Sequence, residues 1–247
     1  MSTVLTIARN EARRIFVSPL AWAVLAVLQL IFAVVFVSLL FSYAQDSQVR
    51  DQSQGVADVI GGGLFGFAAV VLLLSIPLMT MRLFAEERKS GSLTLLLSAP
   101  ASLIEIVLGK FLGLVSFMLA ALVLLAIMPL TLLSGTHLDL GFIASGLLGL
   151  FLLMLSFGAA GLFVSTLTRE PTIAAVVSFG LLLFFWLIQI FANQQIPFAS
   201  AIGYLAIIGH FQSLLRGIFN TADVVYYLLF TVFFLWLAVL RLDIERN

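Results

Sequence analysis

The chain has 247 residues, of which 62% are hydrophobic and 10% are charged. Soluble domains carry about 25% charged residues, so this composition excludes a soluble globular protein and indicates an integral membrane protein. The formal net charge is zero, and the chain has no cysteine, which excludes disulfides and thiolate metal sites.

The first predicted element is an amphipathic helix over residues 1–18. Arg9, Arg13 and Arg14 lie on one side of it, and apolar residues recur at helical spacing on another. We expect this helix to lie along the lipid headgroups with its arginines toward anionic lipid. A disordered basic tail is the alternative, which the regular apolar spacing disfavours.

Six apolar stretches are long enough to cross a membrane, and we expect residues 19–247 to form one transmembrane domain. The first stretch would span roughly 36 Å at about 1.5 Å per residue. It is much longer than the roughly 7–15 apolar residues of a signal peptide, so we expect an uncleaved anchor. The predicted spans are residues 19–42, 59–81, 104 or 109 to 133, 141–167, 172–192 and 223–240.

Charges crowd together between the second and third spans, in residues 82–110. Charged side chains are costly in a bilayer core, so we expect this segment to lie in water. Within it, a charged turn and Gly91 precede an apolar run that starts at Leu93, a pattern typical of a short helix at the membrane surface. A plain water-exposed connector is the alternative. The charged residues are Arg82, Glu86, Glu87, Arg88, Lys89, Glu105 and Lys110.

Residues 196–219 are apolar, but proline and glycine interrupt them and they carry His210, Gln212 and Arg216. The segment is too polar for a regular span and too apolar for a loop. We predict a re-entrant hairpin, two short helices that enter the membrane from the external side and turn back. A seventh span is the alternative, and it would place the C-terminus outside.

The distribution of Lys and Arg predicts the orientation. With six spans, 10 of the 12 Lys and Arg residues fall on the side that carries both termini and residues 82–110, and only Arg50 and Arg216 fall on the other side. The positive-inside rule then places both termini in the cytoplasm. Seven spans would weaken this asymmetry, so six are preferred.

When the third span is taken from residue 109, the interiors of the predicted spans contain no Asp, Glu, Lys, Arg or His. Ion-coupled carriers, voltage sensors and intramembrane proteases need such groups at membrane depth, so these classes are disfavoured, as is a lipid-handling enzyme with a serine nucleophile. The chain has no Gly-x-x-x-x-Gly-Lys-Ser/Thr loop, and His137 with Asp139 is too small a set for a metal site. We therefore expect this chain to have no cofactor, no metal and no catalytic residue. We expect it to change conformation with energy supplied by another protein.

Two motifs resemble those of ABC-2-type transporter permeases. The first is Phe-Ala-Glu-Glu-Arg-Lys-Ser-Gly-Ser-Leu-Thr-Leu-Leu-Leu-Ser-Ala-Pro at residues 84–100, followed by Ile-Val-Leu-Gly-Lys at 106–110. Its only mild departure is Ser92, where threonine is usual. The second is Gly-His-Phe-Gln-Ser-Leu-Leu-Arg-Gly at 209–217, followed by Asp-Val-Val-Tyr-Tyr at 223–227. It is similar to the branch that contains the gliding-motility permeases and the permeases of nitrous oxide reductase maturation.

The resemblance implies that residues 82–110 contain a coupling helix, which sits in a groove of a separate ABC ATPase subunit. It implies two ATPase chains, which bind ATP and Mg, and a second permease chain that is either identical to this one or different from it. The expected surroundings of the complex are membrane lipids, and no nucleic acid is expected as a partner. The resemblance also implies the inner membrane of a bacterium. The residues it assigns to ATPase coupling are Glu86, Glu87, Arg88, Lys89, Gly91, Leu93, Leu96, Leu97 and Pro100.

We therefore predict the permease subunit of an ABC transporter, which moves substrate across the cytoplasmic membrane by coupling to ATP hydrolysis on its partner. His210, Gln212 and Arg216 would line or lid the external exit, or else act as capping and snorkelling groups at the interface. The alternative function is a membrane scaffold or receptor subunit that transports nothing. The presence or absence of ATP-dependent coupling distinguishes the two functions.

Overall fold

The structure is a computed structural model, and it describes residues 3–45, 61–98, 101–134, 139–192 and 203–246. Every regular element in these ranges is helical, and six of the helices are long and apolar enough to cross a membrane. The predicted class, an all-α protein with six membrane-spanning helices, is confirmed to that extent. The elements are α1 (Thr3–Val17), α2 (Pro19–Gln45), α4 (Gly63–Thr80), α5 (Ala85–Ser90), α6 (Ser92–Ser98), α7 (Leu103–Leu130), η2 (Thr131–Ser134), α8 (Leu140–Leu167), α9 (Pro171–Ala192), α11 (Ile207–Leu215) and α12 (Thr221–Arg246).

The start of α7 corrects one expectation. A capping box fixes this start at Ser102: the Ser102 hydroxyl accepts from the Glu105 backbone N–H, and the Glu105 carboxylate accepts from the Ser102 N–H. The helix therefore includes Glu105 and Lys110, which were expected to lie in a water-exposed loop. Lys110 is two turns inside the helix and its side chain is only 2% exposed.

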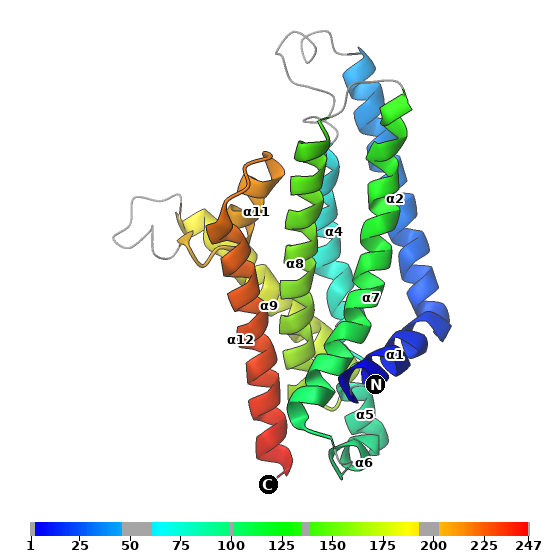
Figure 1. The fold of residues 1–247 in the computed structure, drawn as a ribbon, viewed down its shortest axis with the longest axis vertical. Helices are drawn as coiled ribbons and strands as arrows, with labels where there is room; N and C mark the ends of the chain where they lie inside the picture. The colour runs from blue at the N-terminus through cyan, green and yellow to red at the C-terminus, as the bar shows by residue number, and fades with distance from the viewer. Residues whose placement is uncertain (1–2, 46–60, 99–100, 135–138, 193–202, 247) are drawn as a thin grey trace.

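The long helices run side by side along the longest axis of the molecule (Figure 1). Both termini, α5 and α6 gather at one end, which we call the charged end, and α11 lies toward the opposite end. Helix α1 crosses the bundle obliquely near the charged end and packs along α7. Helix α11 has only nine residues, so it is too short to be the alternative seventh span.

Helix α8 lies at the centre and contacts α4, α7, α9, α11 and α12. Its small residues allow this, because Gly158 packs against Met118 of α7 and Gly161 packs against Thr80 of α4 with no room for a methyl group. On another side, the Ser156 hydroxyl donates to the Tyr227 carbonyl of α12 across 3.3 Å. Neighbouring helices thus approach α8 closely around most of its circumference.

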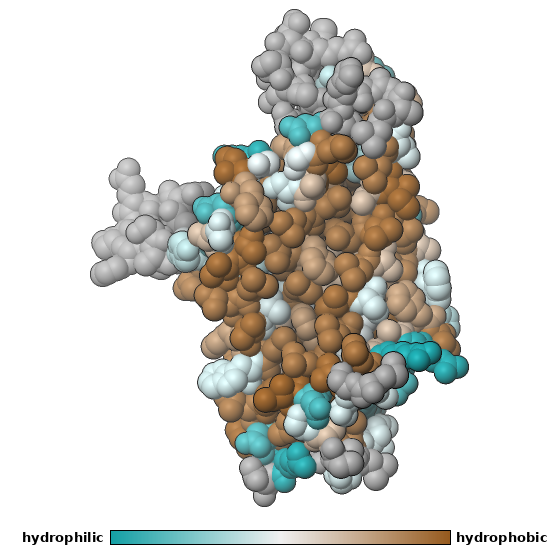
Figure 2. Space-filling view, viewed as in Figure 1, coloured by the Kyte–Doolittle hydropathy of each residue, from teal (hydrophilic) through white to brown (hydrophobic). Residues whose placement is uncertain are grey.

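The outer faces of α2, α9 and α12 carry large exposed apolar side chains, such as Leu30, Phe184 and Leu229. Figure 2 shows hydrophobic residues over the middle of the molecule and hydrophilic residues toward its ends. Such a broad apolar belt is typical of a surface that faces lipid. Most of the predicted connector at 43–58 lies outside the described residues, and so does the first part of the predicted hairpin, residues 196–202.

Candidate functional site

The segment singled out by its charges forms two short helices at the charged end. Leu83, Phe84 and Ala85 are buried and hold the start of α5 against the core. Gly91 separates α5 from α6 and has φ of 76°, in the left-handed region that only glycine adopts without strain. The predicted turn at Gly91 is therefore present.

A buried lysine joins this segment to two other helices. Lys110 Nζ of α7 lies 2.6 Å from Glu87 Oε1 of α5 and 3.3 Å from Glu11 Oε2 of α1. It also lies 5.1 Å from the centre of the Phe84 ring. A buried ammonium group requires charged or polar partners to offset its desolvation, and the two carboxylates supply them. Lys110 therefore holds α1, α5 and α7 in one arrangement.

Arg14 covers this cluster from the surface. Its guanidinium donates to Glu86 Oε2 at 3.1 Å and to Glu87 Oε1 at 3.2 Å, and also to the Arg82 carbonyl at 3.4 Å. The expectation that the arginines of α1 face lipid is therefore wrong for Arg14. The predicted amphipathic character of α1 is present, but part of its polar face meets protein.

Two further ion pairs extend from α5 to the rest of the charged end. The Arg88 guanidinium pairs with the Glu245 carboxylate at the end of α12, and the Arg88 side chain is only 7% exposed. Lys89 Nζ lies 2.8 Å from Glu170 Oε2, in the turn between α8 and α9, and both of these side chains are more than half exposed. Helix α5 is thus tied to α1, α7, α12 and the α8–α9 turn.

The predicted coupling residues differ in what they offer to a partner protein. All four charged residues have intramolecular partners, but the Glu86 and Lys89 side chains are 46% and 58% exposed, whereas those of Glu87 and Arg88 are 17% and 7% exposed. Leu93 is buried within the chain's own core, and Leu96 packs partly buried against it. Pro100 and the Leu97 side chain lie outside the described residues.

Sequence reasoning gave no role to Glu11 or Gly113, and it noted Gly109 only as part of the Gly-Lys motif. The two glycines form a Gly-x-x-x-Gly pattern on α7, and α1 lies directly on it. A Cβ atom at Gly109 would be 2.6 Å from Ile7 Cβ, and one at Gly113 would be 2.6 Å from Glu11 Cβ. The small-residue spacing could have indicated a close helix contact, but not which helix makes it.

A second polar cluster lies on the opposite side of the bundle, between α11 and α12. His210 Nδ1 is 2.6 Å from Asp223 Oδ1, and His210 Nε2 is 3.0 Å from the Tyr204 carbonyl. The His210 ring stacks on Tyr226 with centroids 4.0 Å apart, and the buried Tyr227 hydroxyl donates to the Ile207 carbonyl. This cluster fixes α11 on the first turns of α12.

The three residues predicted for the external exit do not form one site. His210 is buried, whereas Gln212 and Arg216 are exposed. Gln212 borders a hollow of about 380 Å³ between α9 and α11, and Arg216 borders another of about 470 Å³ beside Asp139, which caps the start of α8. His210 is therefore packed within the protein, whereas Gln212 and Arg216 each line a hollow.

A sequence model of the family described as ABC-2 family transporter protein matches residues 5–243, nearly the whole chain. The chain belongs to the ABC-2 family of transporter proteins. No curated protein matches it. As an ABC-2 family member with six apolar helices, it is a multi-pass membrane permease subunit of an ABC transporter, and the family implies an ABC ATPase partner.

Proposed function

We propose that this ABC-2 permease moves its substrate by coupling to ATP hydrolysis on a separate ATPase subunit, and that α5 and α6 are the point of contact. The observation that carries the proposal is the set of ion pairs from α5 to α1, α7, α12 and the α8–α9 turn. A short helix attached to four parts of the bundle can pass on a displacement to all of them. An unattached surface loop could not.

In the proposed mechanism, closure of the ATPase dimer displaces α5 and α6 as a unit. Lys110, paired with Glu87 of α5, passes the displacement to α7, and Glu245, paired with Arg88, passes it to α12, because ion pairs with low exposure resist separation. The packed spans then move as rigid elements, which opens or closes a path between two permease chains. In this mechanism the permease chain transmits the displacement through its helices, while the partner ATPase binds ATP and Mg.

The proposed assembly contains two ATPase chains and two permease chains, identical or different, in the inner membrane of a bacterium, with no nucleic acid. Both termini and the charged end face the cytoplasm, and α1 lies at the membrane interface. Residues 203–219, with α11, form the described part of a re-entrant hairpin on the external side. The second motif favours the branch of the gliding-motility and nitrous oxide reductase maturation permeases.

The absence of cysteine allows a direct test of contact and orientation. Ser90→Cys places a thiol at an exposed position of α5, and Ala222→Cys places a matched thiol at an exposed position of α12 near the opposite end. We expect a thiol-reactive crosslinker to join the Ser90→Cys variant, and not the Ala222→Cys variant, to the copurifying ATPase. A membrane-impermeant maleimide should label Ser90→Cys only from the cytoplasmic side.

The alternative function, a scaffold or receptor subunit, predicts a different result. Such a subunit could bind a partner at Ser90 but would not drive ATP-dependent movement of substrate in reconstituted vesicles. Labelling of Ser90→Cys from the external side, or crosslinking of the ATPase to Ala222→Cys instead, would contradict the proposed coupling.

A further inference from the structure

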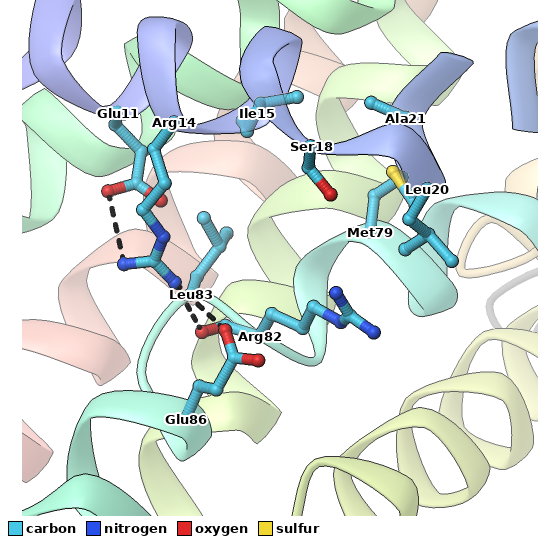
Figure 3. Close-up of a pocket in the computed structure, with 10 residues that line it drawn as sticks. All are labelled: Glu11, Arg14, Ile15, Ser18, Leu20, Ala21, Met79, Arg82, Leu83 and Glu86. Carbon is cyan, nitrogen blue, oxygen red and sulfur yellow. Dashed lines mark hydrogen bonds and ion pairs between the residues drawn. The ribbon is translucent and has the colours of Figure 1, made fainter. Parts of the chain in front are cut away.

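A pocket of about 220 Å³ lies at the charged end, between α1, the start of α2 and the end of α4 (Figure 3). Ile15, Leu20 and Met79 form part of its apolar wall, and Arg82 and Ser18 contribute polar groups. In a membrane crossed by α2 and α4, as the proposed function requires, a pocket beside the ends of these helices would lie at the level of the lipid headgroups.

The charges around this pocket are unequally satisfied. Arg14 pairs with both acidic residues of the lining, Glu11 and Glu86. The Arg82 guanidinium has no hydrogen-bond or ion-pair partner among the described residues, although the Arg82 carbonyl accepts from Arg14. In Figure 3 the guanidinium extends away from Glu86, toward the side of the pocket where Leu20 and Met79 lie. The pocket therefore combines an apolar wall with one cation, Arg82, that has no ion-pair partner among the described residues.

We propose that this pocket binds the phosphate of an anionic phospholipid. Arg82 supplies a planar set of N–H donors that suits phosphate oxygens, and the Ser18 hydroxyl, which points into the same space, supplies a further donor. The acyl chains would follow the exposed apolar surface of α2, beginning at Trp22. Free phosphate shares the headgroup chemistry, but it makes no use of this apolar surface.

The test is native mass spectrometry of the full chain in detergent, titrated with phosphatidylglycerol, phosphatidylcholine or inorganic phosphate. We expect the wild-type chain to retain phosphatidylglycerol in preference to phosphatidylcholine. Arg82→Gln should weaken that retention about tenfold or more, because a charge-assisted hydrogen bond contributes more than a neutral one. Arg82→Lys, which keeps the charge but not the planar donors, should have a smaller effect.

Arg169→Gln is the matched control. Arg169 is an exposed arginine at the same end, it has no side-chain partner among the described residues, and it lies outside the pocket lining. Its replacement should leave phosphatidylglycerol retention unchanged. Equal losses in Arg82→Gln and Arg169→Gln would indicate general charge attraction and overturn the proposal. Displacement of the lipid by equimolar inorganic phosphate would instead assign the pocket to a free anion, which also overturns it.

A thermal unfolding scan distinguishes a specific loss of lipid binding from a loss that results from unfolding. Arg82→Gln removes a side chain that has no partner within the described residues, so its midpoint in lipid-free detergent should equal that of the wild type. Ser18→Ala provides a second, milder variant, for which we expect a loss of about threefold. A chain that loses the lipid only when its unfolding midpoint also falls would contradict a site at Arg82.

Discussion

Lys110 Nζ of α7 lies 2.6 Å from Glu87 Oε1 of α5, and the Lys110 side chain is 2% exposed. A residue of the predicted coupling segment is therefore held by an ion pair inside the protein rather than left free for a partner. The pair explains how a polar segment at the end of the bundle is fixed to a long membrane-spanning helix.

Replacing Lys110 should be strongly destabilising. Lys110→Met removes the buried cation from Glu11 and Glu87 and leaves them, among the described residues, only the more exposed Arg14 as a partner. Breaking a buried pair in this way costs about 3–5 kcal/mol. Lys89→Met is the control, because its pair with Glu170 is exposed and such pairs contribute about 0–1 kcal/mol. The measurement is the free energy of unfolding in detergent. Similar losses in both variants would show that burial of Lys110 is not the cause.

The contact between α1 and α7 should be sensitive to a single methyl group. Gly113→Ala would place its Cβ 2.6 Å from Glu11 Cβ, so α1 must shift and the ion pairs of Glu11 must lengthen. We expect a loss of about 1–3 kcal/mol of stability. Gly180→Ala on α9 is the control, since nothing lies within 4 Å of its added Cβ, and helix propensity alone should make it neutral or slightly stabilising. The measurement is the thermal unfolding midpoint of both variants, and an equal midpoint in Gly113→Ala and Gly180→Ala would contradict the prediction.

The pairs of α5 with the rest of the charged end should differ in strength. In a double-mutant cycle on Arg88 and Glu245 we expect a coupling energy above about 1 kcal/mol, because the Arg88 side chain is largely buried. The same cycle on Lys89 and Glu170 should give about 0.5 kcal/mol or less. The exchange Arg88→Glu with Glu245→Arg should recover part of the stability that either replacement loses. No recovery would show that the two residues act independently.

The cluster at the opposite side of the bundle predicts the protonation of His210. Its Nε2 lies 3.0 Å from the Tyr204 carbonyl, which can only accept, so we expect Nε2 to carry a proton, while Nδ1 lies 2.6 Å from Asp223 Oδ1. In a His137→Gln background, the nitrogen NMR signals of His210 should show a protonated, hydrogen-bonded Nε2. Asp223→Asn should lower stability by about 1.5–3 kcal/mol. An Nε2 without a proton would contradict this assignment.

Much of the fold could be predicted from the sequence. The lengths of the apolar runs predicted six spans, and the observed helices begin or end within a few residues of them at most of the described boundaries. The larger difference is at a polar end, because α12 continues to Arg246, beyond the predicted end of the last span at residue 240. The capping box at Ser102 selects the earlier of the two predicted starts of the third span. Helical propensity and caps, rather than hydropathy, determine such ends.

The sequence by itself determined the membrane class, the span count, the charged segment, the turn at Gly91 and the likeness to ABC-2 permeases. Hydropathy is a sum over neighbouring residues, so it can be evaluated without knowing the fold. Only the tertiary structure decided that Lys110 pairs with Glu11, 99 positions away, that α1 rests on Gly109 and Gly113, and that His210 faces Asp223. A charge in the chain predicts the need for a partner, but which partner it meets depends on how the helices pack.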